Sequence, residues 1–155
     1  MLKSVEGNFE NPEVNELLTK HFIELRAASP EGSAHVLDIP GLKVPSIKFW
    51  SLWEEEKLIG CGALKFLDKE HGEFKSIRIH DNFRNQGQGI NVINHLINEA
   101  KKLEIKRLSI ETGAGEFFVP ARKLFKKTGF IVCEPFAHYK EDVNSVYLTK
   151  LINNI

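Results

Sequence analysis

The stretch from Lys75 to Thr112 reads "KSIRIHDNFRNQGQGINVINHLINEAKKLEIKRLSIET" and contains the pattern that decides the fold. It begins with residues typical of a strand and ends in a second strand-like segment, "RLSIET" at 107–112. Between them, apolar residues recur at intervals of three and four, as on one face of a helix. They are Ile90, Ile93, Leu96, Ile97, Ala100 and Leu103. A strand, a helix and a strand in this order predict a parallel pair joined by a right-handed crossover.

The segments before this stretch predict an antiparallel meander, because short polar turns separate three strand-like segments. These lie at 46–55, 57–68 and 72–81. The middle segment is apolar at odd and even positions alike, which is typical of a central strand covered on both faces. Further upstream, a short strand is predicted near residues 2–5, and a helix begins with Asn11 as N-cap and Pro12 as first residue.

The segments after the stretch complete the predicted sheet. A helix at about 119–128 precedes Gly129, which stands where a glycine commonly ends a helix, and strands are predicted at 130–133 and 145–151. The predicted fold is α/β: a single-domain mixed sheet with an antiparallel N-terminal meander followed by strand, helix, strand and helix. It has about seven strands and four helices. The Pro-, Gly- and Ser-rich segment 28–45 is predicted as a mobile loop beside a site.

Composition narrows the class of protein. A chain of 155 residues suits one domain over 1–155. Lys plus Arg equals Asp plus Glu at 21 each, so neither nucleic acid nor an anionic membrane is expected as a partner. Cys61 and Cys133 lack metal-binding or disulfide spacing, so we expect no metal site and a reducing, cytoplasmic location. No segment approaches the roughly 20 apolar residues that span a bilayer.

The glycine-containing segment "RNQGQGI" at 84–90 predicts an anion site. It follows a strand and opens a helix, so its backbone N–H groups and the positive end of the helix dipole face one place. Gly87 and Gly89 permit close approach by a phosphate or pyrophosphate, and Arg84 adds charge. The other donors are the amides of Asn85, Gln86, Gln88 and Ile90.

Three other interpretations of this segment compete with the anion site of a coenzyme or nucleotide. A tight turn into a helix needs no ligand. A Walker loop requires Gly-Lys-Ser/Thr, whereas Ile90 and Asn91 follow Gly89 here. A dinucleotide site fits Gly87, Gly89 and the later acid Glu111, but its third glycine is replaced by Val92 and a meander precedes it.

The same stretch, followed by "ARKLFKKTGF" at 121–130, resembles the GNAT superfamily of coenzyme A-dependent N-acetyltransferases. The shared signature is Arg/Gln-x-x-Gly-x-Gly/Ala after a strand. The longer segment "SIETGAGEFFVPARKLFKKTGF" is similar to small bacterial acetyltransferases of the YsnE type. The resemblance implies transfer of an acetyl group from acetyl-CoA to the amine of a small-molecule acceptor, directly within a ternary complex.

The resemblance also implies the roles of individual residues. Backbone groups of Ile77, Arg78 and Ile79 would pair with the pantetheine arm, and the amides from Asn85 to Ile90 would surround the pyrophosphate. Phe125 takes the cofactor-side position of a tyrosine that protonates the departing thiolate in the family. A phenyl ring cannot donate a proton. Tyr139 is a candidate substitute, or else it packs against the acceptor pocket or the sheet edge.

Two carboxylates are candidates for the base that deprotonates the acceptor. Glu73 resembles the base of histone-type members, and Glu111 resembles that of ribosomal-protein-type members. Alternatively, Glu73 is a solvated residue at a strand start, and Glu111 caps a helix or pairs with Arg122.

The acceptor itself is less well defined by the sequence. Arg26 and His35 would suit an acceptor with a carboxylate, although solvation explains them as well. The competing function is a coenzyme A-binding regulatory or interaction domain without catalysis, suggested by Phe118 and Phe125. The oligomeric state stays open, with a homodimer as one candidate.

Overall fold

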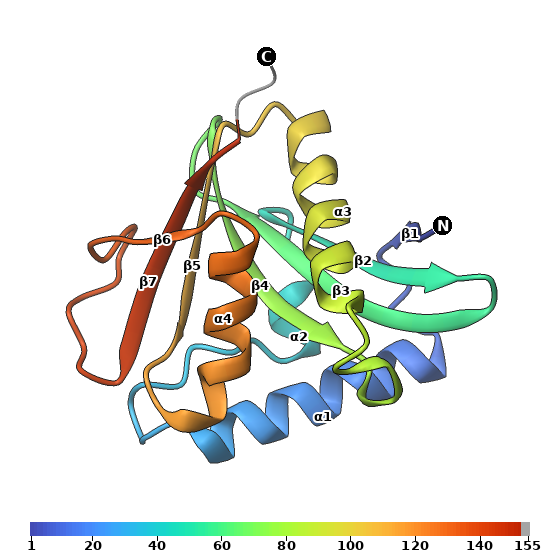
Figure 1. The fold of residues 1–155 in the computed structure, drawn as a ribbon, viewed down its shortest axis with the longest axis horizontal. Coiled ribbons are helices and arrows are strands. Elements are labelled where there is room, and N and C mark those ends of the chain that lie inside the picture. The colour runs from blue at the N-terminus through green and yellow to red at the C-terminus, as the bar shows by residue number, and fades with distance from the viewer. Residues whose placement is uncertain (153–155) are drawn as a thin grey trace.

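Seven strands form one sheet in the order β1-β2-β3-β4-β5-β7-β6 (Figure 1). The structure is a computed structural model and describes residues 1–152. The strands are β1 (Lys3–Glu6), β2 (Ile47–Glu54), β3 (Lys57–Phe66), β4 (His71–Ile79), β5 (Arg107–Gly113), β6 (Ile131–Val132) and β7 (Ser145–Leu151). The helices are α1 (Pro12–Ala28), α2 (Ile39–Leu42), α3 (Gln88–Lys102) and α4 (Val119–Lys127). Two short 3-10 turns are η1 (Asp81–Phe83) and η2 (Glu116–Phe118).

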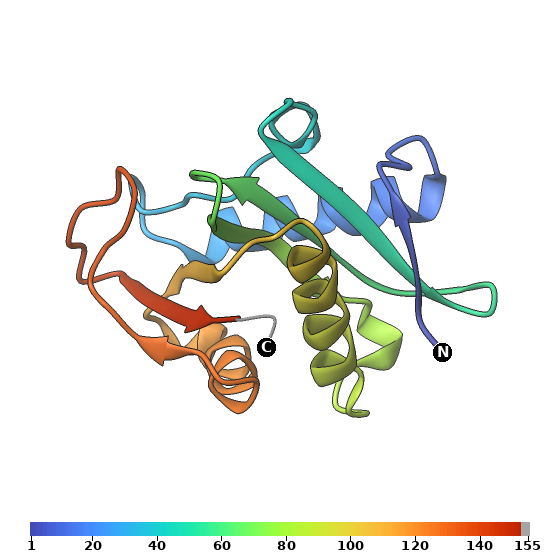
Figure 2. The same ribbon diagram turned by 90° about the horizontal axis from the view of Figure 1, so that it is seen from above.

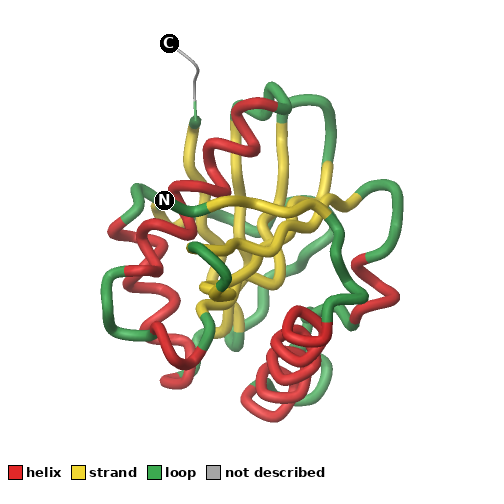
Figure 3. Tube along the Cα trace, turned by 90° about the vertical axis from the view of Figure 1, so that its right-hand side faces the viewer, coloured by secondary structure: helices red, strands yellow, loops and turns green. Residues whose placement is uncertain are grey.

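Helices cover both faces of the sheet (Figures 2 and 3). The α1 and α2 helices lie on one face, and α3 and α4 lie side by side on the other. The larger core lies under α3 and α4 and includes Ile59, Leu64, Leu96 and Leu108, while a smaller core under α1 includes Phe49. Both faces of β3 are therefore buried, which confirms its prediction as the central, doubly covered strand.

The predicted beginning of α1 is confirmed. The Asn11 side chain accepts hydrogen bonds from the backbone N–H groups of Glu13 and Val14, and Pro12 occupies the first turn. Asn11 thereby satisfies two of the free N–H groups at a helix start. None of the helices among residues 1–152 has the length and apolar character that a bilayer crossing requires.

The prediction of a loop over residues 28–45 is wrong in one part, because this segment contains the short helix α2. The Asp38 side chain accepts from the Gly41 N–H, and a proline lies in the first turn of this short helix. Such a single turn buries Leu42 against α1 and β2, and this tertiary contact outweighs the loop-like composition. The strand predicted at 130–133 is also shorter, since β6 consists of Ile131 and Val132, and Cys133 adds one backbone hydrogen bond to the Tyr147 carbonyl of β7.

The opening that matters for function lies between β4 and β5. These strands are parallel, as predicted, but pair only at His71–Arg107, Gly72–Leu108 and Glu73–Ser109. Beyond Glu73 they diverge. Ser76 has a positive φ of 54°, and the register between β3 and β4 shifts near Cys61 and Ala63, so a bulge bends β4 away from β5.

Candidate active site

A cavity of about 740 Å³ opens where β4 and β5 diverge. Its lining comes from both faces of the sheet. Residues of α3, α4 and the loop before α3 line one half, and α1 with the loop after it lines the other. A second hollow, of about 810 Å³, lies on the outer side of α1 around Asn15 and Thr19. It does not reach the divergent strands, so the chemistry belongs to the first cavity.

The glycine-containing segment forms one end of this cavity. The α3 helix begins after Gly87, which has a left-handed φ of 79° and provides no side-chain cap to the helix. Five of the seven predicted anion-binding residues line the cavity, namely Arg84, Asn85, Gly87, Gly89 and Ile90. The side chain of Gln86 instead donates to the Asn82 carbonyl, and that of Gln88 accepts from Asn91.

Gly89 brings the first turn of α3 close to α4. A Cβ atom at this position would lie 2.7 Å from Leu124 Cδ2, so any larger side chain would fill the space between the two helices. Lys123 and Lys127 of α4 also line the cavity. A recess with free helix N–H groups and several cations fits a pyrophosphate, and coenzyme A carries one.

The edge of β4 continues the cavity toward the middle of the sheet. Ile77 and Ile79 line it, and the edge facing β5 makes no ladder pairs with that strand beyond Glu73. Backbone groups on this edge can pair with an extended amide chain such as pantetheine. Arg78 also lines the cavity and is buried, with Nη2 3.0 Å from Glu24 Oε1 of α1 and 3.1 Å from Asp81 Oδ1, and its Nε has no hydrogen-bond partner among residues 1–152.

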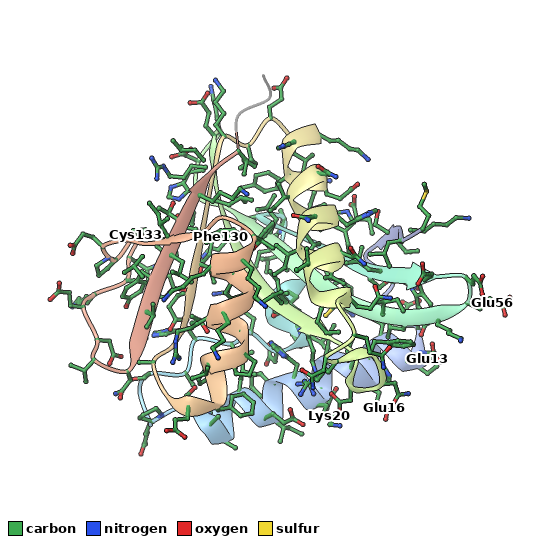
Figure 4. The ribbon with its side chains drawn as sticks, in the orientation of Figure 1. Glu13, Glu16, Lys20, Glu56, Phe130 and Cys133 are labelled. Carbon is green, nitrogen blue, oxygen red and sulfur yellow. The ribbon has the colours of Figure 1, made fainter. Side chains whose placement is uncertain are left out.

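Ion pairs fasten α1 to the loop that follows β4. Lys20, on the surface of α1 (Figure 4), donates to the Asp81 carboxylate, and Asp81 also pairs with Arg78 and Arg84. These three cations together hold the pKa of Asp81 below its usual range, with Lys20 as the main cause. The loop before α3 is therefore fixed against the helix that covers the other half of the cavity.

Glu73 lies at the point where the strands part. Only 1% of it is exposed, so its interpretation as a solvated residue at a strand start is wrong. Its Oε2 accepts from the Tyr139 hydroxyl at 2.6 Å and from Lys75 Nζ at 3.3 Å, and Lys75 also donates to the Tyr139 hydroxyl at 3.1 Å. Its Oε1 is buried and has no hydrogen-bond partner among residues 1–152. A buried carboxylate oxygen without a donor is costly unless a ligand supplies one.

Glu111 lines the same cavity from β5. Its Oε2 accepts from the Ser145 hydroxyl at 2.8 Å. Burial raises the pKa of the Glu111 carboxyl above its ordinary value, and the charge of Glu73 adds to this against the opposing effects of Ser145, His35 and Lys75. The predicted alternative of a pair with Arg122 is wrong, because that guanidinium donates to the carbonyls of Gly113 and Gly115.

Tyr139 lies in the loop between β6 and β7, as expected, and its hydroxyl proton points to Glu73. Burial, followed by the charge of Glu73, raises the pKa of this hydroxyl well above its ordinary value. A weaker acid is a poorer donor to a thiolate. Phe125 is buried against Phe130, with ring centroids 6.0 Å apart, and also lines the cavity.

The loop after α1 meets the loop before β7 over these residues. Ser33 Oγ lies 2.7 Å from Asp142 Oδ2, and the His35 ring lies edge-on to the Tyr139 ring with centroids 5.1 Å apart. The sequence-based prediction missed Ser33, Ser145 and Lys75. Lys75 could have been found, because alternate residues of a strand share a face and Glu73 is two positions away. Ser33 and Ser145 carried no such signal.

An anion-binding helix start, a divergent strand pair and a buried carboxylate beside the gap define an acyl-CoA-dependent transferase. The family model described as Acetyltransferase (GNAT) family matches residues 12–130, so the chain belongs to this family. It is an acetyl-CoA-dependent N-acetyltransferase.

The chain is similar to curated relatives over most of its length. It is 47% identical to "Uncharacterized N-acetyltransferase YsnE" of Bacillus subtilis, covering 89% of this chain and 91% of that protein. It is 40% identical to "Uncharacterized N-acetyltransferase YedL" of Escherichia coli, covering 90% and 87%. A GNAT family acetyltransferase from Elizabethkingia anophelis, solved with acetyl-CoA bound, has a TM-score of 0.68 at 20% identity, covering 97% of each chain. That likeness shows the shared fold.

Proposed function

We propose that the protein transfers the acetyl group directly to a primary amine of a small molecule within a ternary complex, with Glu73 as the general base. The observation that carries this proposal is the unpartnered Oε1 of a carboxylate that is 1% exposed and lines the cavity. An alkylammonium has a pKa of about 10.4 and must lose a proton before it can attack. A fixed carboxylate at the gap between β4 and β5 can accept that proton.

Each half of the cavity has its own task in the proposed reaction. Acetyl-CoA supplies an acyl thioester when bound. The amides from Asn85 to Ile90 hold the pyrophosphate, and the edges of Ile77 and Ile79 align the pantetheine arm. The acceptor enters from the half under α1, where Glu73 takes one proton from it. The net change forms a C–N bond, breaks the thioester C–S bond, and leaves an amide, a thiol and one proton.

In this proposal Tyr139 positions Glu73 and does not protonate the thiolate. The Tyr139 hydroxyl donates its hydrogen bond to Glu73, and the pKa of this hydroxyl is raised. A thiolate with a reference pKa near 8.5 can leave without a dedicated acid. Phe125, in place of the family's tyrosine, supports the same conclusion, and it also motivates the second candidate: a coenzyme A-binding domain without catalysis.

The experiment that separates the two candidates follows thiol release from acetyl-CoA in the presence of a broad panel of amines and amino acids. Acceptor-dependent release together with mass-spectrometric detection of an acetylated acceptor is the expected result. Tight coenzyme A binding, seen as a raised melting temperature, with no acceptor-dependent release would favour the binding domain.

A Tyr139→Phe variant should lower kcat/KM about 10- to 100-fold, because a hydrogen bond to a charged group contributes roughly 1.5–3 kcal/mol. Steady-state thiol-release kinetics with an accepted amine would measure this loss.

Tyr147→Phe is the matched control, since the Tyr147 hydroxyl donates to the Lys140 carbonyl and not to Glu73. It should leave kcat/KM close to that of the unchanged protein. If Tyr139→Phe abolished kcat while Glu73→Gln kept most of it, Tyr139 would be the thiolate acid and the positioning role would be wrong.

A further inference from the structure

Polar atoms without partners gather around the cavity. Among residues 1–152, five buried side-chain nitrogen or oxygen atoms have no hydrogen-bond partner, and four of them belong to residues that line this cavity. They are His21 Nδ1, Glu73 Oε1, Ser76 Oγ and Arg78 Nε. Burying a polar atom without a partner is unfavourable, so such atoms are rare in folded proteins. A ligand that pairs with them inside the cavity would remove this cost.

Arg78 determines what kind of group can pair at its end of the cavity. Its side chain is 2% exposed, and its ion pairs with Glu24 and Asp81 both use Nη2. No residue among 1–152 accepts from the Nε–H group. A guanidinium donates hydrogen bonds and accepts none, so the missing partner is an acceptor. An ionised oxygen, as in a carboxylate, forms the strongest hydrogen bond of this kind.

Two further donors come from neighbouring positions. Ser76 is two residues before Arg78 on β4, and His21 lies one helical turn before Glu24, the α1 partner of Arg78. Burial, followed by the charges of Arg78 and Arg84, lowers the pKa of His21 to about 3. The imidazole is therefore neutral at ordinary pH, and its Nδ1 can donate in one tautomer. The positive field that acts on His21 also favours a negatively charged ligand.

The opposite charge lies farther back along the same strand. Glu73 is five residues before Arg78 on β4, and Glu111 of β5 lines the cavity near enough for the charge of Glu73 to act on it. A strand rises about 3.4 Å per residue, so the Cα atoms of Glu73 and Arg78 are at most about 17 Å apart, and their long side chains shorten the gap. The cavity thus offers a carboxylate at one place and a guanidinium at another.

The two residues that the sequence suggested for carboxylate binding separate in the structure. Arg26 lies over the Phe22 ring, with Cζ 5.4 Å from the ring centroid, and is outside the lining of the cavity as the described residues form it. His35 lines the cavity, edge-on to the Tyr139 ring and close enough to Glu111 to lower its pKa. His35 therefore belongs to the end where the carboxyl groups lie.

We propose that the acceptor is an amine that also carries a carboxylate, and that Arg78 Nε, Ser76 Oγ and His21 Nδ1 form the subsite for this carboxylate. The inference rests on the proposed function, in which Glu73 takes a proton from the amine, and it narrows the substrate class to amino acids. The acceptor lies along β4, with its ammonium group toward Glu73 and its carboxylate toward Arg78.

The test compares amino acids with the amines that lack only the carboxylate: phenylalanine with 2-phenylethylamine, lysine with cadaverine, and 4-aminobutyrate with propylamine. The carboxamide of each acid keeps an oxygen but removes the charge. Binding to the coenzyme A-loaded protein is measured by calorimetry, and acetylation is followed separately as thiol release from acetyl-CoA. We expect at least one acid to bind about 10-fold or more tightly than its amine and its amide, and no set to show the reverse order.

Arg78→Lys should reduce the affinity for that acid about 10-fold or more and leave the affinity for its amine nearly unchanged. The new ammonium can still pair with Glu24 or Asp81, but the Nε–H group is lost. Arg107→Lys is the matched control, since Arg107 is exposed on β5 outside the cavity lining, and it should keep the preference. If His35→Ala removed the preference and Arg78→Lys kept it, the assignment of the carboxylate to Arg78 would be wrong.

Ser76→Ala tests the subsite without disturbing an ion pair. The hydroxyl has no partner among residues 1–152, so its removal should not lower the melting temperature. It should weaken binding of the acid several-fold and leave binding of the amine unchanged. A lower melting temperature with unchanged affinity for the acid would show a structural role and would contradict the place of Ser76 in the subsite.

The two readouts separate this inference from the proposed function. Thiol release with the amines, beside equal or weaker binding of the acids, would overturn the acceptor class while leaving the enzyme intact. Carboxylate-dependent binding without thiol release would overturn catalysis while supporting the subsite. Equal binding of the acids and their amides would overturn the role given to the charge, and failure of all nine compounds to bind would overturn the acceptor class.

Discussion

Gly89→Asp should reduce coenzyme A affinity at least about 100-fold, so that the cofactor no longer raises the melting temperature. The new carboxylate would lie in the first turn of α3, in the recess that fits the pyrophosphate. Two like charges about 4 Å apart repel by roughly 4 kcal/mol at an effective dielectric constant of 20. A loss of 1.4 kcal/mol is tenfold in affinity, so relaxation of the side chain would still leave a large effect.

Two control variants separate charge from shape in this experiment. Gly89→Ala adds only a Cβ, which would meet the flexible end of Leu124 at 2.7 Å, so a small loss of affinity is expected. Gly115→Asp adds the same charge at an exposed position where a Cβ meets nothing within 4 Å. It should bind coenzyme A normally. If Gly89→Asp kept its affinity for coenzyme A, the assignment of this loop to the pyrophosphate would be wrong.

Glu73→Gln should lower kcat/KM for the acceptor by about 100-fold or more, because positioned general bases contribute roughly 10²- to 10⁴-fold. Coenzyme A affinity should not change, because Glu73 serves the half of the cavity under α1, whereas the recess at the start of α3 lies on the opposite face of the sheet. The deficit should shrink as the pH approaches about 10, where the acceptor loses its proton to solvent. Thiol-release kinetics from pH 6 to about 10 would measure both effects.

The amide in Glu73→Gln leaves the Lys75 ammonium, 10% exposed, without its carboxylate, so the melting temperature must be measured beside the activity. Glu70→Gln serves as the control, because Glu70 is exposed and pairs with Lys106 on the surface. Full activity in Glu73→Gln together with a large loss in Glu111→Gln would transfer the role of base to Glu111.

The local patterns were sufficient to predict the strands, the three longer helices and the glycine-containing segment before α3. Asn11 and Pro12 predicted the start of α1 because capping depends on neighbouring residues alone. The run from Arg84 to Ile90 predicted an anion site for the same reason: the donors are consecutive backbone groups of one helix start. The α2 turn was missed, since a four-residue helix is stable only through its contact with the rest of the chain.

The acceptor chemistry could not be predicted to the same extent. Glu73 and Glu111 were both candidates, and no spacing could choose between them. The proposal for Glu73 rests on its burial and on its free oxygen, and Tyr139, which holds the other oxygen, is 66 residues away in the loop before β7. Arg78 was expected to offer its backbone, and only the structure shows that its side chain pairs with α1.

Apart from α2, the sequence by itself determined the order of strands and helices along the chain, the parallel crossover from β4 to β5, and the glycine-containing start of α3. These features depend on residue periodicity and on backbone groups close together in the chain. Only the tertiary structure decided that Glu73 is buried with one free oxygen, that Tyr139 and Lys75 hold the other, and that Arg78 pairs with Glu24 of α1. Burial and pairing depend on which distant segments of the chain come into contact. Here the loop after α1 and the loop before β7 meet over the divergent strands and bury these side chains.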